Sequence, residues 1–241
     1  RIHVFGHDVH TGPHAIEARD RLKAKGYAIR AATFCHMDYS AYDYLKDTRP
    51  EAILDKAEKQ RHLVCAADDV YAVGPLLARN FSRLRNERGE GGHIHSIIPG
   101  FPEAFDAKSF DNPSSALSFF FSGRIDPSLD RLKNSRLVLK ALVQAYQGDT
   151  YSLTSRWQQR GHFYCYGFAP GPADRVWYSG SIDDAAIGGR FTLHMEDFGD
   201  QHVMFRQLAD SHVAIMPSTH EGFGLSGWEA LCAGIPLICS D

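Results

Sequence analysis

The sequence lacks several features that would assign it to a familiar class of protein. Its 26 basic and 29 acidic residues leave a formal net charge of −3, so no global positive field is present to recruit nucleic acid or anionic lipid. No apolar run approaches the roughly 18 residues of a membrane span, and no signal peptide is visible. The five cysteines are odd in number and form no C-x-x-C pair, which argues against a disulfide framework or a zinc ribbon and favours a reducing compartment. We therefore expect a cytoplasmic protein that binds no nucleic acid and has no transmembrane segment in this stretch.

The 241 residues, 44% of them hydrophobic, suffice for one large α/β domain or two domains of ordinary size. The sequence begins at Arg1 in a strand-like run and closes on "LICSD", which reads as the end of a strand. We therefore expect both natural ends to lie outside this sequence.

Short β-prone runs alternate with helical runs in both halves of the chain. The first half holds four such runs, "RIHVF", "AIRAATFCH", "DDVYAVG" and "HIHSIIPG", separated by segments with helical spacing. Residues 99–116 break this rhythm with three prolines and no clear period, which is typical of a connection between domains. The alternation then restarts at "LSFFFSGR". This pattern predicts an α/β fold with two Rossmann-like, doubly wound parallel-sheet lobes facing a cleft, one over residues 1–105 and the other over 106–241.

The stretch "HEGFGLSGWEALCAGIP", residues 220–236, follows a predicted strand and leads into a predicted helix. A glycine-rich turn that opens a helix presents unpaired N–H groups and the positive end of the helix dipole, which favour phosphate. Gly222 and Gly224 allow the backbone to approach a ligand closely. Glu221 and Glu229 bracket the turn, and their carboxylates are suited to accept hydrogen bonds from sugar hydroxyls. Two glutamates at this spacing are weak evidence alone, because glutamate is common on protein surfaces.

The fuller string is more specific: it reads PS-x2-EGFGL-x3-EAL-x2-G-x-P. It resembles the E-x7-E region of retaining GT-B glycosyltransferases, especially family 4, which includes the sucrose synthase and sucrose-phosphate synthase group. The resemblance implies that Glu229 binds the ribose of a nucleotide sugar and that Glu221 orients the transferred sugar. It also implies that the donor contacts the turn at Gly222, Phe223, Gly224 and Leu225.

A second block, "FFFSGRIDPSLDRLKN" at 119–134, resembles the GR…K element of the same family. On that match Arg124 and Lys133 hold the nucleotide diphosphate, with Lys133 and Asn134 opening a helix. A guanidinium fork and an ammonium group suit this task, because they neutralise the leaving group. The loop between them is longer than is usual, which leaves Arg131 as a rival to Lys133. Asn134 stands where the family often has glycine, as it does in the sucrose-synthesising members.

A third block, "HMEDFGDQHVMFRQLADSHVAIMPS", resembles the family's segment ahead of E-x7-E, and it would place residues 194–196 near the base.

Two loops of the first half, "GHDVHTGPHA" and "TFCHMDYSAY", follow successive predicted strands and should open at the same edge of the sheet. They resemble the "GH…G" and "TGHS" loops of the sucrose-phosphate synthase type. On that match His36 faces the donor sugar, while Asp8, His10 and Gly12 lie near the acceptor or the transferred sugar. A histidine at a strand end is also often a purely structural residue, and that alternative stays open for each of them.

A metal site is not expected. His36 and Asp38 have the spacing of a ligand pair, but the sequence suggests no third ligand and no suitably placed D-x-D motif. We expect no metal and no cofactor, with the nucleotide-diphosphate sugar serving as substrate.

These observations favour a retaining, metal-independent glycosyltransferase of the hexosyltransferase type, acting on a nucleotide sugar and a small-molecule, glycan or lipid-linked acceptor. One alternative is a non-catalytic pair of lobes that binds nucleotide sugars as a sensor or scaffold. Another is a sugar-nucleotide epimerase or a phosphorylase of the same fold, against which the EGFGL block argues.

Overall fold

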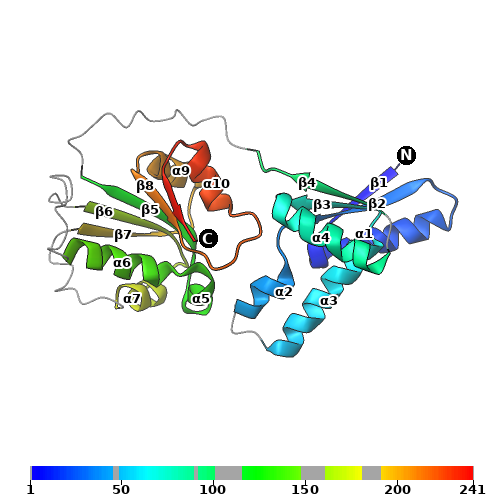
Figure 1. Cartoon of the computed structure of the whole chain (residues 1–241), viewed down its shortest axis with the longest axis horizontal. Helices are drawn as coiled ribbons and strands as arrows, with labels where there is room; N and C mark the ends of the chain where they lie inside the picture. The colour runs from blue at the N-terminus through cyan, green and yellow to red at the C-terminus, as the bar shows by residue number, and fades with distance from the viewer. Residues whose placement is uncertain are drawn as a thin grey trace. The chain divides into compact units, whose positions relative to one another are not determined.

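The computed structural model describes residues 2–45, 49–89, 92–100, 116–147, 161–180 and 191–240. Contacts divide the chain into two compact units, each with its own parallel sheet (Figure 1). The first comprises Arg1–Gly100 with His220–Phe223, and the second comprises Phe101–Thr219 with Gly224–Asp241. The predicted boundary between residues 105 and 106, and most of the predicted connection, fall in 101–115, outside the described residues.

The first unit contains a four-stranded parallel sheet of order β1-β2-β3-β4. Its strands are β1 Ile2–His7, β2 Ile29–Cys35, β3 Asp69–Val73 and β4 His93–Ile97. The predicted helices are present as α1 Asp8–Lys23, α3 Pro50–Ala66 and α4 Pro75–Arg88, while the short α2 Tyr39–Tyr42 and the 3-10 turn η1 Asp43–Leu45 were not predicted. Pro75 opens α4 at its first turn, a position where the missing N–H of proline is tolerated.

The described helices of the first unit cover one face of its sheet. The strands follow one another across the sheet in chain order, and crossovers between parallel strands are right-handed. The helices α1, α3 and α4 therefore lie on the same side of the sheet (Figure 1). The core there joins strand residues such as Cys35 and Val70 to Leu77 and Phe81 of α4. On the opposite face, stacked rings run across the strands, with centroids 5.1 Å apart for Phe34–Tyr71 and 4.7 Å apart for Tyr71–His95.

The second unit contains a five-stranded parallel sheet of order β7-β6-β5-β8-β9. Its strands are β5 Ser118–Ile125, β6 Gly161–Phe168, β7 Phe191–Asp197, β8 Val213–Met216 and β9 Leu237–Cys239. The chain moves outward from β5 through β6 to β7, then returns to the other side of β5 for β8 and β9. This reversal is the predicted doubly wound pattern, and it creates a switch point between β5 and β8, where sheets of this kind bind their ligands.

Helices pack on both faces of the second sheet. They are α5 Asp130–Lys133, α6 Ser135–Gln147, α7 Ala173–Ser179, α9 Gln201–Ala209 and α10 Leu225–Cys232, with a 3-10 turn η2 Pro127–Leu129. On one face of the sheet, α6 packs against β5 and β6. On the other face, α9 and α10 pack against Phe120 and Ala214. Asp200 caps α9, because its carboxylate accepts the His202 N–H at 2.8 Å. The sequence did not predict α7.

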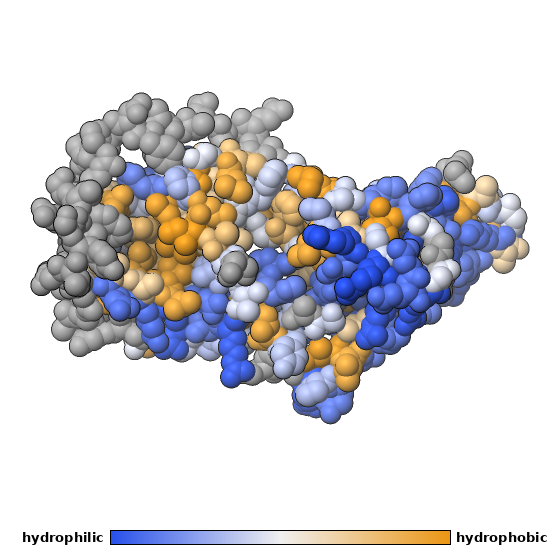
Figure 2. All heavy atoms as spheres, in the orientation of Figure 1, coloured by the Kyte–Doolittle hydropathy of each residue, from blue (hydrophilic) through white to orange (hydrophobic). Residues whose placement is uncertain are grey.

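Figure 2 shows mostly hydrophilic residues over the helices of the first unit and a gathering of hydrophobic residues over the strands of the second. Within the described part of the chain, no helix is both long and apolar enough to cross a membrane.

Candidate functional site

The carboxyl end of β5 presents Arg124 to solvent. Its side chain is 69% exposed, and its Nε lies 2.9 Å from Oδ2 of Asp126. The other oxygen of Asp126 accepts the Ser128 N–H at 2.9 Å and so caps η2. Arg124, which is predicted to bind the diphosphate, is therefore exposed, and the carboxylate of Asp126, two residues away, holds its side chain in place. Sequence reasoning missed Asp126, although a carboxylate two residues after Arg124 was a signal for it.

Lys133 lies beside the same strand end. Lys133 is half-buried. Its Cδ is 3.9 Å from the position that a Cβ would take on Gly123, the residue before Arg124. Arg131, its rival, is exposed. The prediction that Lys133 and Asn134 open a long helix is wrong: Lys133 ends α5, and α6 begins at Ser135. The break occurs because Asn134 adopts a left-handed conformation with φ of 51°, which asparagine and glycine tolerate best.

The segment that carries Lys133 is hydrogen-bonded to the segment that follows β8. Asn134 Nδ2 donates to the Pro217 carbonyl at 2.8 Å and to Thr219 Oγ1 at 3.0 Å. The Thr219 N–H donates to the Leu132 carbonyl at 2.8 Å, and its hydroxyl donates to the Arg131 carbonyl at 2.9 Å. The two predicted donor-binding segments are therefore fixed to each other at the switch point. Thr219 was also missed, and no local pattern marks its pairing with a residue 85 positions away.

The glycine-rich turn ends in Gly224, which has φ of 79° and ψ of 55° and precedes the first residue of α10. This left-handed conformation requires glycine. Gly224 provides no side-chain cap, so the first turn of α10 keeps backbone N–H groups for an acceptor from outside the helix. The predicted helix is present and starts at Leu225. Gly227 packs into the sheet, where an added Cβ would meet the Met216 methyl at 3.0 Å.

The two glutamates occupy different places. Glu229 lies on α10, half-buried, and burial raises the pKa of its carboxyl. Glu221 lies with Gly222 and Phe223 in the segment that groups with the first unit. In the second unit the structure thus collects Arg124 and Lys133 at β5, together with Gly224, Leu225 and Glu229 on and before α10.

The raised pKa of Glu229 predicts a stability effect. The folded state holds the proton of this carboxyl more tightly than the unfolded state, so its ionisation destabilises the fold at pH values above the folded pKa. Glu229→Gln should therefore raise the Tm of the ligand-free protein at pH 7, and this gain should disappear below about pH 4, where the carboxyl is protonated in both states. Thermal unfolding at the two pH values measures it. Glu51→Gln, at an exposed position, should give no gain, and a gain of the same size there would contradict the assignment to burial.

At the carboxyl edge of the first sheet, two histidine rings meet. His7 ends β1 and His36 follows β2, and their rings stack at 5.4 Å between centroids with an angle of 10° between the planes. His7 Nδ1 and His36 Nε2 are 3.2 Å apart, within hydrogen-bonding distance. The two loops therefore open at the same edge, as the sequence predicts, and both histidines are exposed.

The three residues expected on the acceptor side do not share one surface. Asp8 is only 2% exposed and points into the unit, where its Oδ2 accepts the His36 N–H at 3.4 Å. Burial raises the pKa of this carboxyl. His10 is exposed, whereas Gly12 is buried in α1 with an added Cβ only 2.6 Å from the Leu63 methyl groups. Packing of α1 on α3 thus accounts for the glycine, and a role toward the acceptor stays a prediction for all three.

Two further residues that the sequence analysis considered have defined contacts. Asp38, considered as a metal partner of His36, accepts the Ser40 N–H at 3.0 Å and caps α2. His194, expected near the base, stacks on Tyr164 with centroids 4.3 Å apart, and burial lowers its pKa. Among the described residues, no cluster of three or more histidine, cysteine, aspartate or glutamate side chains could hold a metal ion.

Known proteins share the sequence pattern and the fold of this chain. The sequence matches the family described as "Family 4 Glycosyltransferase in conflict systems" over residues 2–241. Since this match spans nearly the whole sequence, the chain belongs to that family. A search of the curated proteins found none that matches.

Solved structures support the fold. Sucrose-phosphate synthase from Thermosynechococcus elongatus is 19% identical, with a TM-score of 0.64 over 98% of this chain and 55% of its own. A UDP-forming α,α-trehalose-phosphate synthase from Burkholderia vietnamiensis is 17% identical, with a TM-score of 0.63 over 98% and 58%. The pneumococcal O-GlcNAc transferase GtfA, solved with UDP and GlcNAc, is 17% identical, with a TM-score of 0.62 over 98% and 42%. The units thus have the Rossmann-like architecture of GT-B glycosyltransferases, and the chain spans about half the length of these proteins.

Proposed function

We propose that this protein transfers a sugar from a nucleotide-sugar donor with retention of configuration and without a metal ion. The observation that carries the proposal is the convergence of Arg124, Lys133 and the uncapped start of α10 at the switch point between β5 and β8. Two cations beside a helix N-terminus suit a diphosphate, and preorganised charge of this kind is typically the largest contribution to a group-transfer rate.

The proposed roles rest on the resemblance to the family's motifs, and the chemistry of the charged side chains suits them. Arg124, Lys133 and the amides of residues 223–225 stabilise the departing diphosphate, and because they supply its counter-charge the proposal includes no metal. Glu229 binds the ribose hydroxyls, and Glu221 orients the transferred sugar. His36 is proposed to contact that sugar, and Asp8, His10 and Gly12 to lie toward the acceptor or the sugar.

Two of the structural relatives are described with UDP, so UDP-sugars are the first donors to test. The acceptor is proposed to be a small molecule, a glycan or a lipid-linked sugar, and the protein to act in the cytoplasm.

The decisive experiment offers the full-length protein a panel of nucleotide sugars with EDTA present and measures the release of free nucleotide. Titration calorimetry with the bare nucleoside diphosphates runs beside it. Turnover of one donor with EDTA present supports the proposal, and analysis of the product's anomeric configuration tests retention. Binding of a nucleotide without turnover of any donor would favour the alternative, a sensor or scaffold that binds nucleotide sugars.

Lys133→Ala is expected to reduce turnover well beyond Arg131→Ala. Lys133 is half-buried and its Cδ lies beside Gly123, which precedes Arg124 in the chain, whereas Arg131 is exposed. Steady-state rates at saturating donor compare the two variants directly. The reverse order would show that the longer loop has passed the phosphate contact to Arg131.

A further inference from the structure

A single buried side chain joins three segments at the carboxyl edge of the first sheet. Gln60 lies on α3 and is 3% exposed. Its Nε2 donates to Asp8 Oδ1 at 2.9 Å and to the Met37 carbonyl at 2.8 Å, and its Oε1 accepts the Tyr39 N–H at 3.0 Å. Both amide hydrogens and the amide oxygen are thus used, by partners from α1, from the loop after β2, and from the start of α2.

These bonds define the orientation of the amide. If the amide were flipped, its NH2 group would face the Tyr39 N–H and its oxygen would face the Asp8 carboxylate and the Met37 carbonyl, so donors would meet donors and acceptors would meet acceptors. Only one orientation satisfies all three partners, and a buried polar group without a partner destabilises the fold. The three partners therefore require the two donors and one acceptor that a glutamine amide provides.

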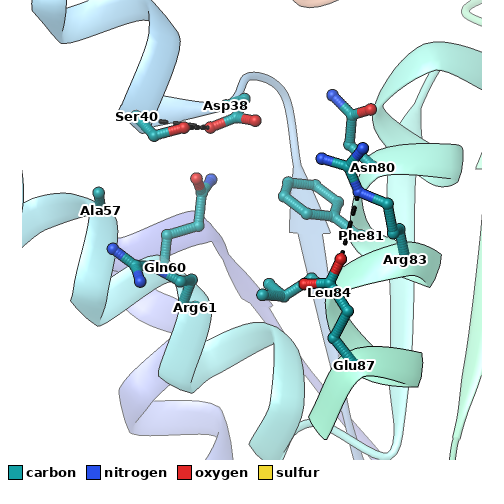
Figure 3. A pocket seen from close by; sticks show the side chains of 10 residues that line it. All are labelled: Asp38, Ser40, Ala57, Gln60, Arg61, Asn80, Phe81, Arg83, Leu84 and Glu87. Atoms are coloured by element: carbon teal, nitrogen blue, oxygen red, sulfur yellow. Dashed lines mark hydrogen bonds and ion pairs between the residues drawn. The ribbon is translucent and has the colours of Figure 1, made fainter.

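The same network surrounds His36. Asp8 accepts the His36 N–H at 3.4 Å. The other two partners of Gln60 follow His36 in the chain, Met37 as the next residue and Tyr39 two residues later. Figure 3 shows the amide of Gln60 pointing from α3 toward the segment that carries Asp38 and Ser40. Of these partners, Asp8 has φ of 44°, in a region that non-glycine residues seldom adopt and that persists only where surrounding contacts enforce it. The network holds this backbone and the loop after β2 together.

We propose that Gln60 is a positioning residue, which holds the loop of residues 36–39 through Asp8, the Met37 carbonyl and the Tyr39 N–H and so sets the place of His36. This inference rests on the proposed function for its effect on catalysis, because His36 is there expected to face the transferred sugar. Gln60 itself is buried and touches no substrate. Its effect should therefore appear in kcat and leave nucleotide binding in the second unit unchanged.

The first variant is Gln60→Met, which keeps the length of the side chain and removes the amide. We expect kcat of the full-length protein to fall about tenfold or more, with the affinity for the bare nucleoside diphosphate unchanged. We also expect faster hydrogen exchange in the peptide that covers residues 36–40, because the Tyr39 N–H loses its acceptor. The matched control is Gln144→Met, the same change at an exposed position of α6, which should alter neither quantity.

The second variant, Gln60→Glu, gives a readout that simple loss of packing would not. It replaces the NH2 donor by a carboxylate oxygen that faces Asp8 and the Met37 carbonyl. Two carboxylates at such a distance cannot both ionise without penalty, and a proton taken up by the pair restores the missing donor. The ratio of Gln60→Glu activity to parent activity should therefore rise as the pH falls from 8 to 5, while the ratio for Gln60→Met stays flat.

Other titratable groups face this region and are common to parent and variant, so the ratio cancels their titration. The pKa values of the Cys35 thiol and the Tyr39 hydroxyl are raised by burial, so both remain neutral across this range. Among the described residues, the charged and titratable groups near Gln60 and its partners include Asp8, Cys35, His36, Asp38, Tyr39, Asp43, Lys56 and Arg61, with Arg83 and Glu87 from α4 and with His7 against His36.

The outcomes separate the two proposals. Unchanged kcat and unchanged exchange in Gln60→Met overturn the positioning role, as does a flat pH ratio for Gln60→Glu. If Gln60→Met does not fold, the pH ratio of Gln60→Glu decides alone. If the parent turns over no donor but Gln60→Met still accelerates exchange at residues 36–40, the loop is positioned as proposed and the catalytic function is what fails.

Discussion

Glu221→Gln is expected to lower kcat by about 10²-fold or more while nucleotide affinity changes little. The proposed contact of Glu221 is with the sugar whose ring flattens and gains positive charge as the glycosidic bond breaks. Glutamine preserves the size of the side chain and much of its hydrogen bonding but removes a negative charge near that ring. A donor-saturation curve for the full-length protein, together with direct titration of the bare nucleoside diphosphate, measures both quantities.

Glu229→Ala is the comparison for this variant. The ribose that Glu229 is proposed to bind changes little during the reaction, so this change should act mainly by raising the donor KM. If both variants lose nucleotide affinity equally and retain kcat, Glu221 is one more binding group. The eight-residue spacing would then describe a nucleotide clamp with no catalytic member.

Arg124→Ala should weaken nucleoside-diphosphate binding by about 1.5–3 kcal/mol, the usual value of a charge-assisted hydrogen bond. The fold should remain intact, because the side chain is 69% exposed and its ion pair with Asp126 lies at the end of β5. Titration calorimetry of parent and variant measures the change. Far-ultraviolet circular dichroism confirms that the variant is folded.

Asp126→Asn is the matched variant with the opposite expectation. It keeps an oxygen for the Ser128 N–H and removes the carboxylate that pairs with Arg124, so diphosphate binding should stay equal or become tighter. Parent-like affinity in Arg124→Ala would refute the assignment of the Gly-Arg element. Weaker binding in Asp126→Asn would show that the carboxylate orients the guanidinium for its ligand.

The alternation of strands and helices was predictable because each element carries its own pattern. Runs such as "SFFFSG" and "VAIM" are apolar enough to be strands buried on both faces, and Pro75 and Asp200 mark helix starts by local chemistry. Element order then determined that the loops with Arg124 and Gly224 would lie at strand ends. The strand order that makes β5 and β8 neighbours depends on contacts far apart in sequence, and no local pattern reveals it.

The parts that sequence reasoning missed depend on tertiary contacts. Gln60 reads as an ordinary polar residue of a helix, and only the fold brings it to Asp8, 52 positions away. The inward direction of Asp8 was equally hidden, because a polar residue after a strand is expected to face solvent. Short helices such as α2 and α7 have too few residues for a period to emerge, and packing against neighbouring elements decides them.

The hydrogen bonds from Asn134 to Pro217 and Thr219 have a consequence for how this family can diverge. Lys133 is located by the bonds of the adjacent Asn134 to the segment after β8, and not by its distance in sequence from Arg124. Insertions between Arg124 and Lys133 can therefore accumulate as η2 and α5 without displacing the lysine. In family members that carry asparagine at this position, the length of the intervening loop can drift while the asparagine and the threonine stay. Aligning those members by motif spacing would put the lysine out of register, whereas alignment on the Asn134–Thr219 pair would recover it.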